Sequence, residues 1–285
     1  MPPHPLLDVT ELSSVEAHLE RVGTVFAVFR DQDSGCVSYG VRLPGGERWF
    51  VKEGTTGRAR ISLCRAWAFH RAVSHPAIVP QVHRIAVRGN WAVVMPWHEG
   101  EVLYHPAAGG TADRTAPGSA MARFRALPLP VATRAWERIL SAHLAVEEAG
   151  YVAVDFYDGA LLYDFTGDTM RLVDLDEYRP GPFVLAEDRL PGSRRFMAPE
   201  EYERGATIDV RTTVFALGRA ARLLLDAGDG ERAWRGSPAQ LGVLHRATRA
   251  DPGRRFASVR RFAAAWHAAG DGHGLRTGHP RPPRA

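Results

Sequence analysis

The pattern of apolar residues changes near residue 100 of this 285-residue chain, and no other feature constrains the fold as strongly. Before that point, short apolar stretches bounded by turn residues predict one helix over 59–73 and strands over 22–29, 36–41, 48–52 and 91–95. The turns are tight, as at Pro44-Gly45-Gly46, so neighbouring strands are expected to pair as antiparallel hairpins. The first hundred residues therefore predict a small β-rich lobe.

Beyond residue 130 the apolar residues recur at helical spacing. The predicted elements are a helix ending at Gly150, strands over 160–163 and 170–173, a buried helix over 214–225 and a final helix over 258–267. His143 lies on the apolar face of the first of these helices and is expected to be a core histidine. Trp97, Trp136 and Trp266 are expected to pack in the core or between lobes.

These elements divide the chain into two lobes of an α+β protein and a tail. We expect an N-terminal β-rich lobe over 1–98 and a larger helical lobe over 99–269. The stretch 104–130 is rich in Gly, Pro and Ala and predicts a loop or linker. The tail over 270–285 mixes Gly, Pro, His and Arg with almost nothing to bury, which predicts a disordered basic segment.

Composition narrows the setting of the protein. The net charge of +4 comes from arginines spread along the chain, and a solvated tail is favoured over a nucleic-acid contact at 270–285. Cys36 and Cys64 lack the spacing of a metal site and are too few for a disulfide framework, which favours a reduced, cytoplasmic setting. The chain start has no secretory pattern, and no apolar run approaches the roughly 18 residues of a membrane helix.

Lys52 is the single lysine among 36 lysines and arginines. Lysine carries a compact charge on a flexible stem, whereas arginine presents a wide planar fork, so a site that needs a point charge needs lysine. A base composition that favours arginine codons would leave one lysine equally well. The surrounding motifs decide between these two interpretations.

A series of short motifs follows in a fixed order. They are Trp49-Phe50-Val51-Lys52, His75-Pro76-Ala77-Ile78-Val79, Met95-Pro96-Trp97-His98, Gly150-Tyr151-Val152-Ala153-Val154-Asp155, Asp174-Leu175-Asp176, Ala198-Pro199-Glu200 and Asp251-Pro252-Gly253-Arg254-Arg255. Their order and spacing, from about Val22 to His267, are similar to the protein kinase superfamily. The chain resembles a bacterial Ser/Thr-protein-kinase-like domain with a degenerate catalytic loop.

The resemblance implies a bilobal, protein-kinase-like fold that uses ATP and Mg²⁺, and it implies a role for each matching residue. Lys52 would orient the α- and β-phosphates, Asp174 would hold Mg²⁺, and Asp155 would accept the proton of the attacking hydroxyl. The nucleotide contacts would come from Gly35 and Val37 in a thin glycine-rich loop and from Met95 and Trp97 at the hinge. Arg255 would pair with Glu200.

The chain departs from the family at several positions. Ala160 stands where kinases place a metal-binding Asn, so Asp158 or Asp176 would supply the missing oxygen. Ala66 stands where the helix before His75 usually carries a Glu, so Asp174 or a bound nucleotide must compensate the Lys52 charge. Further departures are Ala153-Val154 in place of His-Arg, and Thr212-Thr213 in place of an Asp that braces the catalytic loop.

Three functions fit this pattern. The first is a Ser/Thr-kinase-like phosphotransferase acting on a hydroxyl of a protein or a small molecule, and Lys52, Asp155 and Asp174 favour it. The second is a pseudokinase that binds nucleotide and acts as a scaffold or regulator, which Ala66 and Ala160 favour. The third is a small-molecule kinase, which the paired acids Asp174-Leu175-Asp176 favour. The sequence does not identify a substrate or an oligomeric state.

Overall fold

A computed structural model describes residues 3–30, 34–105 and 113–271. Its N-terminal part is built on a six-stranded sheet with the strand order β1-β5-β6-β4-β3-β2. The strands are β1 (Glu11–Leu12), β2 (Thr24–Phe29), β3 (Cys36–Arg42), β4 (Arg48–Gly54), β5 (His83–Val87) and β6 (Asn90–Pro96). All neighbours are antiparallel except β1, which runs parallel to β5. The expected antiparallel hairpins of this part are confirmed.

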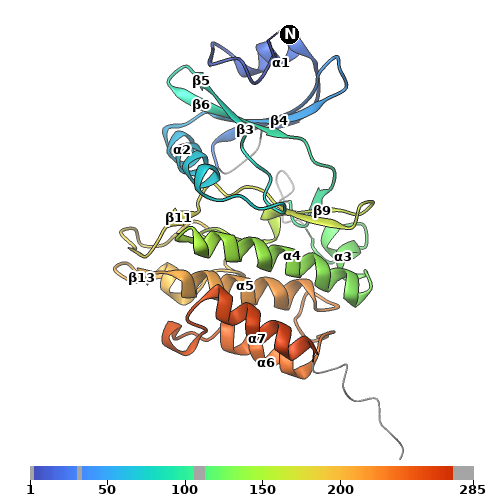
Figure 1. Ribbon diagram of the computed structural model, residues 1–285, viewed down its shortest axis with the longest axis vertical. Helices are drawn as coiled ribbons and strands as arrows, with labels where there is room; N and C mark the ends of the chain where they lie inside the picture. Colours follow the sequence, from blue (N-terminus) through green and yellow to red (C-terminus); the bar gives the residue numbers. More distant parts are fainter. Residues whose placement is uncertain (1–2, 31–33, 106–112, 272–285) are drawn as a thin grey trace, which may run out of the picture.

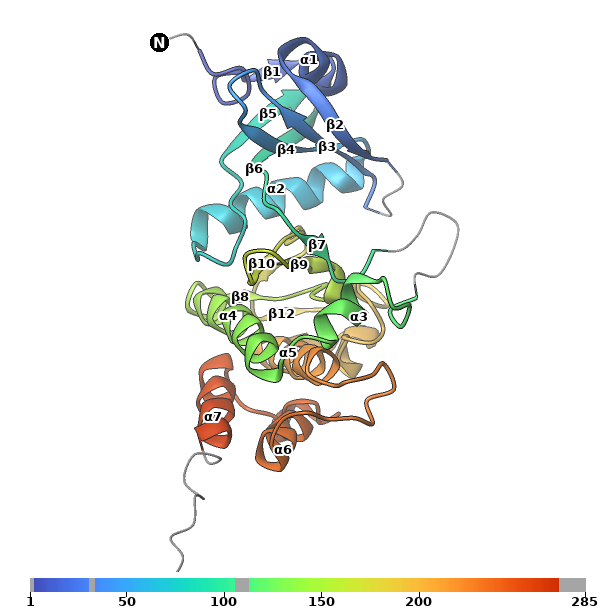
Figure 2. The same cartoon turned by 90° about the vertical axis from the view of Figure 1, so that its right-hand side faces the viewer.

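Two helices cover the two faces of this sheet (Figures 1 and 2). Helix α1 (Val15–Val22) begins at Ser14, whose side chain accepts the Ala17 N–H, and it packs on a core that includes Val51 and Val94. Helix α2 (Gly57–Ala72) begins at Thr56 and lies between the sheet and the helical part of the molecule (Figure 2). Since side chains alternate along a strand, Val51 faces α1 whereas Lys52 faces α2 and the helical part.

The C-terminal part is mainly helical (Figure 1). Its helices are α3 (Ala120–Arg125), α4 (Leu129–Glu148), α5 (Val210–Leu224), α6 (Pro238–Ala247) and α7 (Val259–Asp271), with short 3₁₀ turns over Asp158–Ala160, Pro199–Tyr202 and Pro252–Arg254. Helices α4 and α5 contribute more residues to the core than the other helices of this part, and each buries apolar residues along its length. The molecule is therefore a mixed α+β protein with a β-rich N-terminal sheet and a helical C-terminal part, as expected.

Short strands connect these helices and carry the polar loops. Strands β9 (Leu161–Asp164) and β10 (Thr169–Leu172) form a hairpin that β7 (Glu101–Val102) extends. Two further pairs are β8 (Tyr151–Val152) with β11 (Arg179–Pro180), and β12 (Phe183–Val184) with β13 (Thr207–Ile208). The loop after β8 and the loop after β10 both lie below the N-terminal sheet (Figure 2). The hairpin expected at 160–173 is confirmed.

The expectation of a continuous loop over 104–130 is wrong, because this stretch contains α3 and the start of α4. Ser119 caps α3 by accepting the Ala122 N–H, and Met121 and Phe124 are fully buried. Pro128 and Pro130, which favour a loop in the sequence, instead flank the first residue of α4. Proline is tolerated there because the first-turn N–H groups have no partner within the helix. Residues 106–112 of this stretch lie outside the described residues.

Several residues expected in the core lie there. Trp136 and Trp266 are fully buried, whereas Trp97 is only partly buried. His143 is also fully buried, and its ring contacts the Ile139 carbonyl and the Tyr178 hydroxyl, each at 2.8 Å. Burial lowers the pKa of His143 to about 4, so the ring is neutral at pH 7. The prediction of a satisfied core histidine is confirmed.

Residues 270–271 belong to α7, and the rest of the predicted basic tail lies outside the described residues. Among the helices of the described part, none is long and apolar enough to cross a membrane. Cys36 is buried, Cys64 is exposed, and both are free thiols.

Candidate functional site

Lys52 stands in the middle of the sheet and points toward the helical part. On β4 it lies opposite Ser38 of β3 and Val93 of β6, and its side chain is buried. The ammonium donates hydrogen bonds to Asp174 Oδ1 at 2.6 Å and to Asp176 Oδ2 at 2.5 Å. The expected compensation of the Lys52 charge by Asp174 is confirmed, and Asp176 is a second partner. These two contacts join the sheet to the loop after β10.

The two carboxylates keep Lys52 charged. Burial by itself would lower the pKa of Lys52, but the charges of Asp174 and then Asp176 outweigh it and hold the pKa well above its ordinary value. Burial raises the pKa of Asp176, and the Lys52 ammonium opposes that rise. The centre of the site is thus one buried cation between two acids.

Asp174 is the more open of the two acids. Its side chain is 41% exposed against 10% for Asp176, and one of its oxygens remains beyond the bond to Lys52. Mg²⁺ is usually held by one or two carboxylates together with water and phosphate oxygens. No group of three or more His, Cys, Asp or Glu ligands occurs in the described part of the chain, so a divalent cation here would take most of its ligands from water and phosphate. Asp174 fits the role of the protein ligand.

Asp155 occupies the loop that follows β8. Its backbone has a φ of 59°, and no described residue donates a hydrogen bond to its carboxylate. Burial, followed by the charges of Asp174, Glu177 and Asp176, raises the pKa of Asp155 to about 7. A carboxylate with a pKa near neutrality that is free of hydrogen bonds is suited to accept a proton.

A small cavity lies beside Asp155. It is lined by Ala153, Asp155, Phe156, Gly192, Ser193, Phe196, Met197, Glu201 and Ala216. Gly192 has a φ of 149°, and a Cβ at this position would lie 3.7 Å from Asp155 Oδ1. Ser193, the next residue, lines the same cavity.

The loop that carries Asp155 is braced from the helical part. The Ala153 N–H donates to Thr213 Oγ1 of α5 at 3.0 Å. Thr213 thus provides the support that an Asp was expected to provide at this place. The neighbouring Thr212 donates to Glu200 at 2.8 Å, and Glu200 pairs with Arg255 at 2.6 and 2.8 Å. The expected pairing of Arg255 with Glu200 is confirmed.

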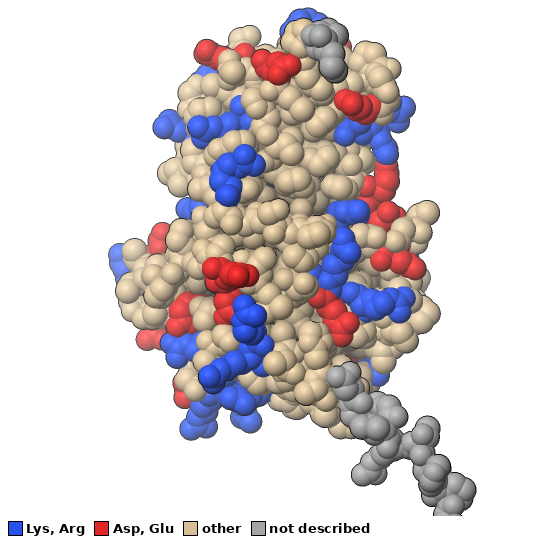
Figure 3. Space-filling view, viewed as in Figure 1, with Lys and Arg blue, Asp and Glu red and all other residues tan. Residues whose placement is uncertain are grey.

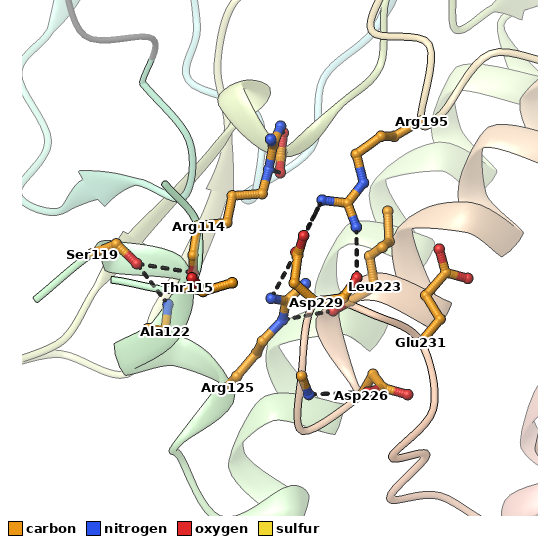
Figure 4. Close-up of polar contacts among 12 residues, drawn as sticks. Arg114, Thr115, Ser119, Ala122, Arg125, Arg195, Leu223, Asp226, Asp229 and Glu231 are labelled. Carbon is orange, nitrogen blue, oxygen red and sulfur yellow. Dashed lines mark hydrogen bonds and ion pairs between the residues drawn. The ribbon is translucent and has the colours of Figure 1, made fainter. Parts of the chain in front are cut away.

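Arg195, which lies between the cavity residues Ser193 and Phe196, forms a further ion pair (Figure 4). Asp229, between α5 and α6, accepts hydrogen bonds from Arg195 at 2.9 Å and from Arg125 at 2.9 Å. Arg125 is the last residue of α3 and is buried. Arg195 is therefore held in a structural contact.

Asp158 does not face a free metal position. Both of its oxygens accept hydrogen bonds from Arg114, at 2.5 and 3.0 Å, and the carboxylate is buried. The guanidinium of Arg114 also stacks on the Tyr104 ring. Ala160 is fully buried against the helical core. The structure therefore gives Asp176 and Asp158, the two candidates for the missing oxygen, cationic side chains as partners.

The predicted nucleotide contacts divide between two faces of the sheet. Met95 lies opposite Phe50 and shares the face of Lys52, and Trp97 follows β6 directly. Val37 is a correction: it lies opposite Glu53, one position out of phase with Lys52, and packs on the core on the α1 side. Gly35 has a φ of 70° and lies against Thr56 at the start of α2. Cys36 and Ser38 share the face of Lys52 instead.

An aromatic cluster, Phe26, Phe50 and Trp97, lies on the Lys52 face of the sheet. The Phe26 and Trp97 rings meet edge to face at 4.7 Å, and the Phe50 and Trp97 centroids are 6.2 Å apart. A Cβ on Gly40 would lie 2.7 Å from the Phe26 ring, so glycine is needed for this close packing. Phe50 and Trp97 are partly buried, Phe26 is exposed, and the three rings offer apolar surface beside the site.

The sequence did not single out Glu177. It accepts hydrogen bonds from Ser62 at 2.6 Å, from Arg65 and from Arg179 at 3.2 Å. Three acids within positions 174–177 are the available sequence signal, but the partners in α2 are more than a hundred residues away in sequence. Arg114 was missed for the same reason, because its partner Asp158 is 44 residues further along the chain.

A scan against protein-family models finds no matching family, and a search of curated proteins finds no match. Any assignment of function therefore depends on the geometry of the site. On the face shown in Figure 3, basic and acidic side chains are interspersed over both parts of the molecule.

Proposed function

We propose that this chain is a phosphotransferase of the protein-kinase type, which transfers the γ-phosphate of ATP to a hydroxyl of a protein or of another alcohol. One arrangement supports the proposal: the buried Lys52 ammonium lies between Asp174 and Asp176, and the charges of both acids raise the pKa of Asp155. The buried pair Glu200–Arg255 and the order of the elements support a bilobal kinase-like arrangement. Two free thiols fit a reducing, cytoplasmic setting.

Each residue has a distinct task in this proposal. Lys52 places a point charge against the α- and β-phosphates, and Asp174 is the protein ligand of Mg²⁺. Mg²⁺, when bound, neutralises charge on the phosphate oxygens. Asp155 accepts the proton as the acceptor oxygen bonds to the γ-phosphorus. The bond from that phosphorus to the β–γ bridging oxygen breaks, and ADP leaves with the electron pair of that bond.

The test is transfer from γ-labelled ATP with Mg²⁺ or Mn²⁺ to the protein itself, a generic protein substrate and a panel of small alcohols. Asp155→Ala should abolish transfer and spare nucleotide binding, because Asp155 acts on the acceptor hydroxyl. Lys52→Met and Asp174→Asn should weaken nucleotide use. Transfer at the normal rate by Asp155→Ala would show that the base is assigned wrongly.

Two observations favour a pseudokinase as the second candidate. Arg114 occupies both oxygens of Asp158, and the Phe26, Phe50 and Trp97 rings fill part of the sheet face beside Lys52. Cation-dependent ATP binding without any Asp155-dependent transfer would support this alternative over the phosphotransferase. The acceptor panel separates a protein-directed enzyme from a small-molecule kinase.

A further inference from the structure

Both carboxylates that hold Lys52 come from a single tripeptide, Asp174-Leu175-Asp176. Helix α2, which packs beside Lys52, contains no Asp or Glu, and its residue Ala66 is fully buried. The partner that a helix might have supplied is therefore supplied by the loop after β10. The two acids also differ: Asp174 is largely open to solvent and Asp176 is buried.

Glu177 ties this loop to α2. It accepts the Ser62 hydroxyl at 2.6 Å and pairs with Arg65, and both residues lie on α2. Arg179 donates to the same carboxylate oxygen as Arg65, at 3.2 Å. Asp176 and Glu177 are neighbours in sequence, so one peptide unit links the partner of Lys52 to the anchor on α2. Motion of either side chain is thereby coupled to the other.

We propose that Asp176 is the permanent partner of Lys52 rather than a cation ligand, and that Glu177 is a positioning residue that fixes Asp176 through Ser62 and Arg65. The inference takes its catalytic meaning from the proposed function, but the geometry that it assigns is measurable on the protein alone. In this proposal Asp174 is the acid that faces the metal cation, and Asp176 is the acid that faces Lys52.

Burial is the physical reason for this division. A buried ammonium without a partner is costly, so Lys52 needs an acid that stays in place whether or not ligand is bound. Asp174 is exposed and would share its charge with a cation, which weakens its hold on Lys52. Asp176 is shielded and anchored through the peptide chain, so its bond to Lys52 survives when Asp174 turns to another ligand.

Lys52 reports on its own environment because it is the only lysine. Protein made with ¹⁵N-lysine gives one ammonium signal, and at a fixed pH the exchange of its protons with water reports how firmly the Lys52 ammonium is held. Its partners are Asp174 at 2.6 Å and Asp176 at 2.5 Å. Asp176→Asn should speed this exchange, and Glu177→Gln should speed it less, because Asp176 remains but is held less firmly.

The matched control is Asp188→Asn, a carboxylate that is 92% exposed and 3.6 Å from Arg204. It should leave the exchange rate of the lysine ammonium unchanged. A wild-type exchange rate in Asp176→Asn overturns the pairing, and one in Glu177→Gln overturns the positioning role. If Asp176→Asn fails to fold, Ser62→Ala combined with Arg65→Gln removes the anchor on the α2 side and must speed the exchange as Glu177→Gln does.

Kinetics separate the two acids. Asp176→Asn and Glu177→Gln should lower kcat by about 10- to 100-fold, the usual cost of losing a supporting contact, and leave the Mg²⁺ concentration for half-maximal rate unchanged. Asp174→Asn should raise that concentration. An equal rise in Asp176→Asn means that Asp176 binds the cation and overturns the inference. If wild-type protein transfers no phosphate, the proposed function fails, while the exchange of the lysine ammonium protons still decides the geometry.

Discussion

Glu200 and Arg255, 55 residues apart in sequence, form a buried ion pair through two parallel hydrogen bonds of 2.6 and 2.8 Å. Thr212 donates to the same carboxylate, so the turn at Pro199–Tyr202, helix α5 and the segment after α6 meet at one side chain. Arginine suits this position because its planar fork matches a carboxylate bidentately. The pair thus joins three segments of the helical part, and the next residue after Glu200, Glu201, lines the cavity beside Asp155.

Breaking this pair should be costly, because one charge is left buried without its partner. Arg255→Met is expected to lower the free energy of unfolding by about 3–5 kcal/mol, measured by urea titration. Arg254→Met is the matched control, since Arg254 is its neighbour and 76% exposed, and it should change stability by less than about 0.5 kcal/mol. Equal effects of the two substitutions would contradict a structural role for the pair.

The acidity of Asp155 should appear in the pH dependence of transfer. Its carboxyl group has a pKa of about 7, raised mainly by burial, and only the ionised form accepts a proton. We therefore expect kcat/KM to rise with pH up to about 7 and then level off. Asp174→Asn removes the largest neighbouring charge and should move this limb to lower pH. A limb that stays in place in Asp174→Asn would argue for another titrating group.

The same group should affect stability with a defined sign. A raised pKa means that the folded state disfavours the ionised carboxylate, so its cost appears as pH rises from about 4 to about 7. Asp155→Asn has no charge to bury and should be more stable than wild type at neutral pH, by about 1 kcal/mol or more, with the difference vanishing near pH 4. Urea unfolding at several pH values measures this difference. A constant difference across the range would contradict the assignment.

His143 should have the opposite dependence on pH. Its pKa is lowered to about 4 by burial, so between about pH 6.5 and 4 the unfolded chain binds a proton that the folded protein does not. Stability should therefore fall in this window as pH falls, by up to about 1.4 kcal/mol per pH unit. His143→Gln should remove that slope even if it lowers stability throughout. His70, also with a pKa lowered to about 4 by burial, adds a parallel slope that remains in the variant.

Local pattern predicted much of the fold. The strand containing Lys52 and the hairpin at 160–173 were found from apolar runs and turn residues, which depend on neighbours in sequence. Helix α3 was missed because its two buried apolar residues, Met121 and Phe124, stand in a Gly- and Pro-rich context. Prolines at the start of α4 had the same effect, since proline favours both loops and first turns.

The sequence proposed the members of the candidate site but only some of its ion pairs. Lys52, Asp155 and Asp174 came from motif order, and so did the pair of Glu200 with Arg255. Which acid meets which cation depends on tertiary contacts across the cleft, so Arg114 on Asp158 and Ser62 on Glu177 had no local signal. Val37, predicted as a nucleotide contact, lies on the face opposite to Lys52, because a shift of one residue on a strand reverses the side chain.

The Asp229 carboxylate accepts hydrogen bonds from two guanidinium groups of distant segments, and its contribution to stability can be tested (Figure 4). Burial alone would raise the pKa of Asp229, but its bonds to Arg195 and Arg125 outweigh it and lower the pKa. Asp229→Asn would remove the counter-charge of Arg125 and Arg195 and leave Arg195 with its hydrogen bond to the backbone carbonyl of residue 229, at 3.2 Å. We expect a loss of about 2–4 kcal/mol in unfolding free energy and faster tryptic cleavage after Arg194 or Arg195.

The sign of the pH effect distinguishes an ion pair from simple packing at Asp229. Since its pKa is lowered in the folded state, the stabilisation is present above the unfolded value of about 3.8 and is lost as pH falls below it. The difference between wild type and Asp229→Asn should therefore shrink in acid. The exposed Asp188→Asn should show no difference at any pH. If trypsin cleaves Asp229→Asn no faster than Asp188→Asn, Arg195 is held by its other contacts. The segment beside Asp155 then does not depend on this pair.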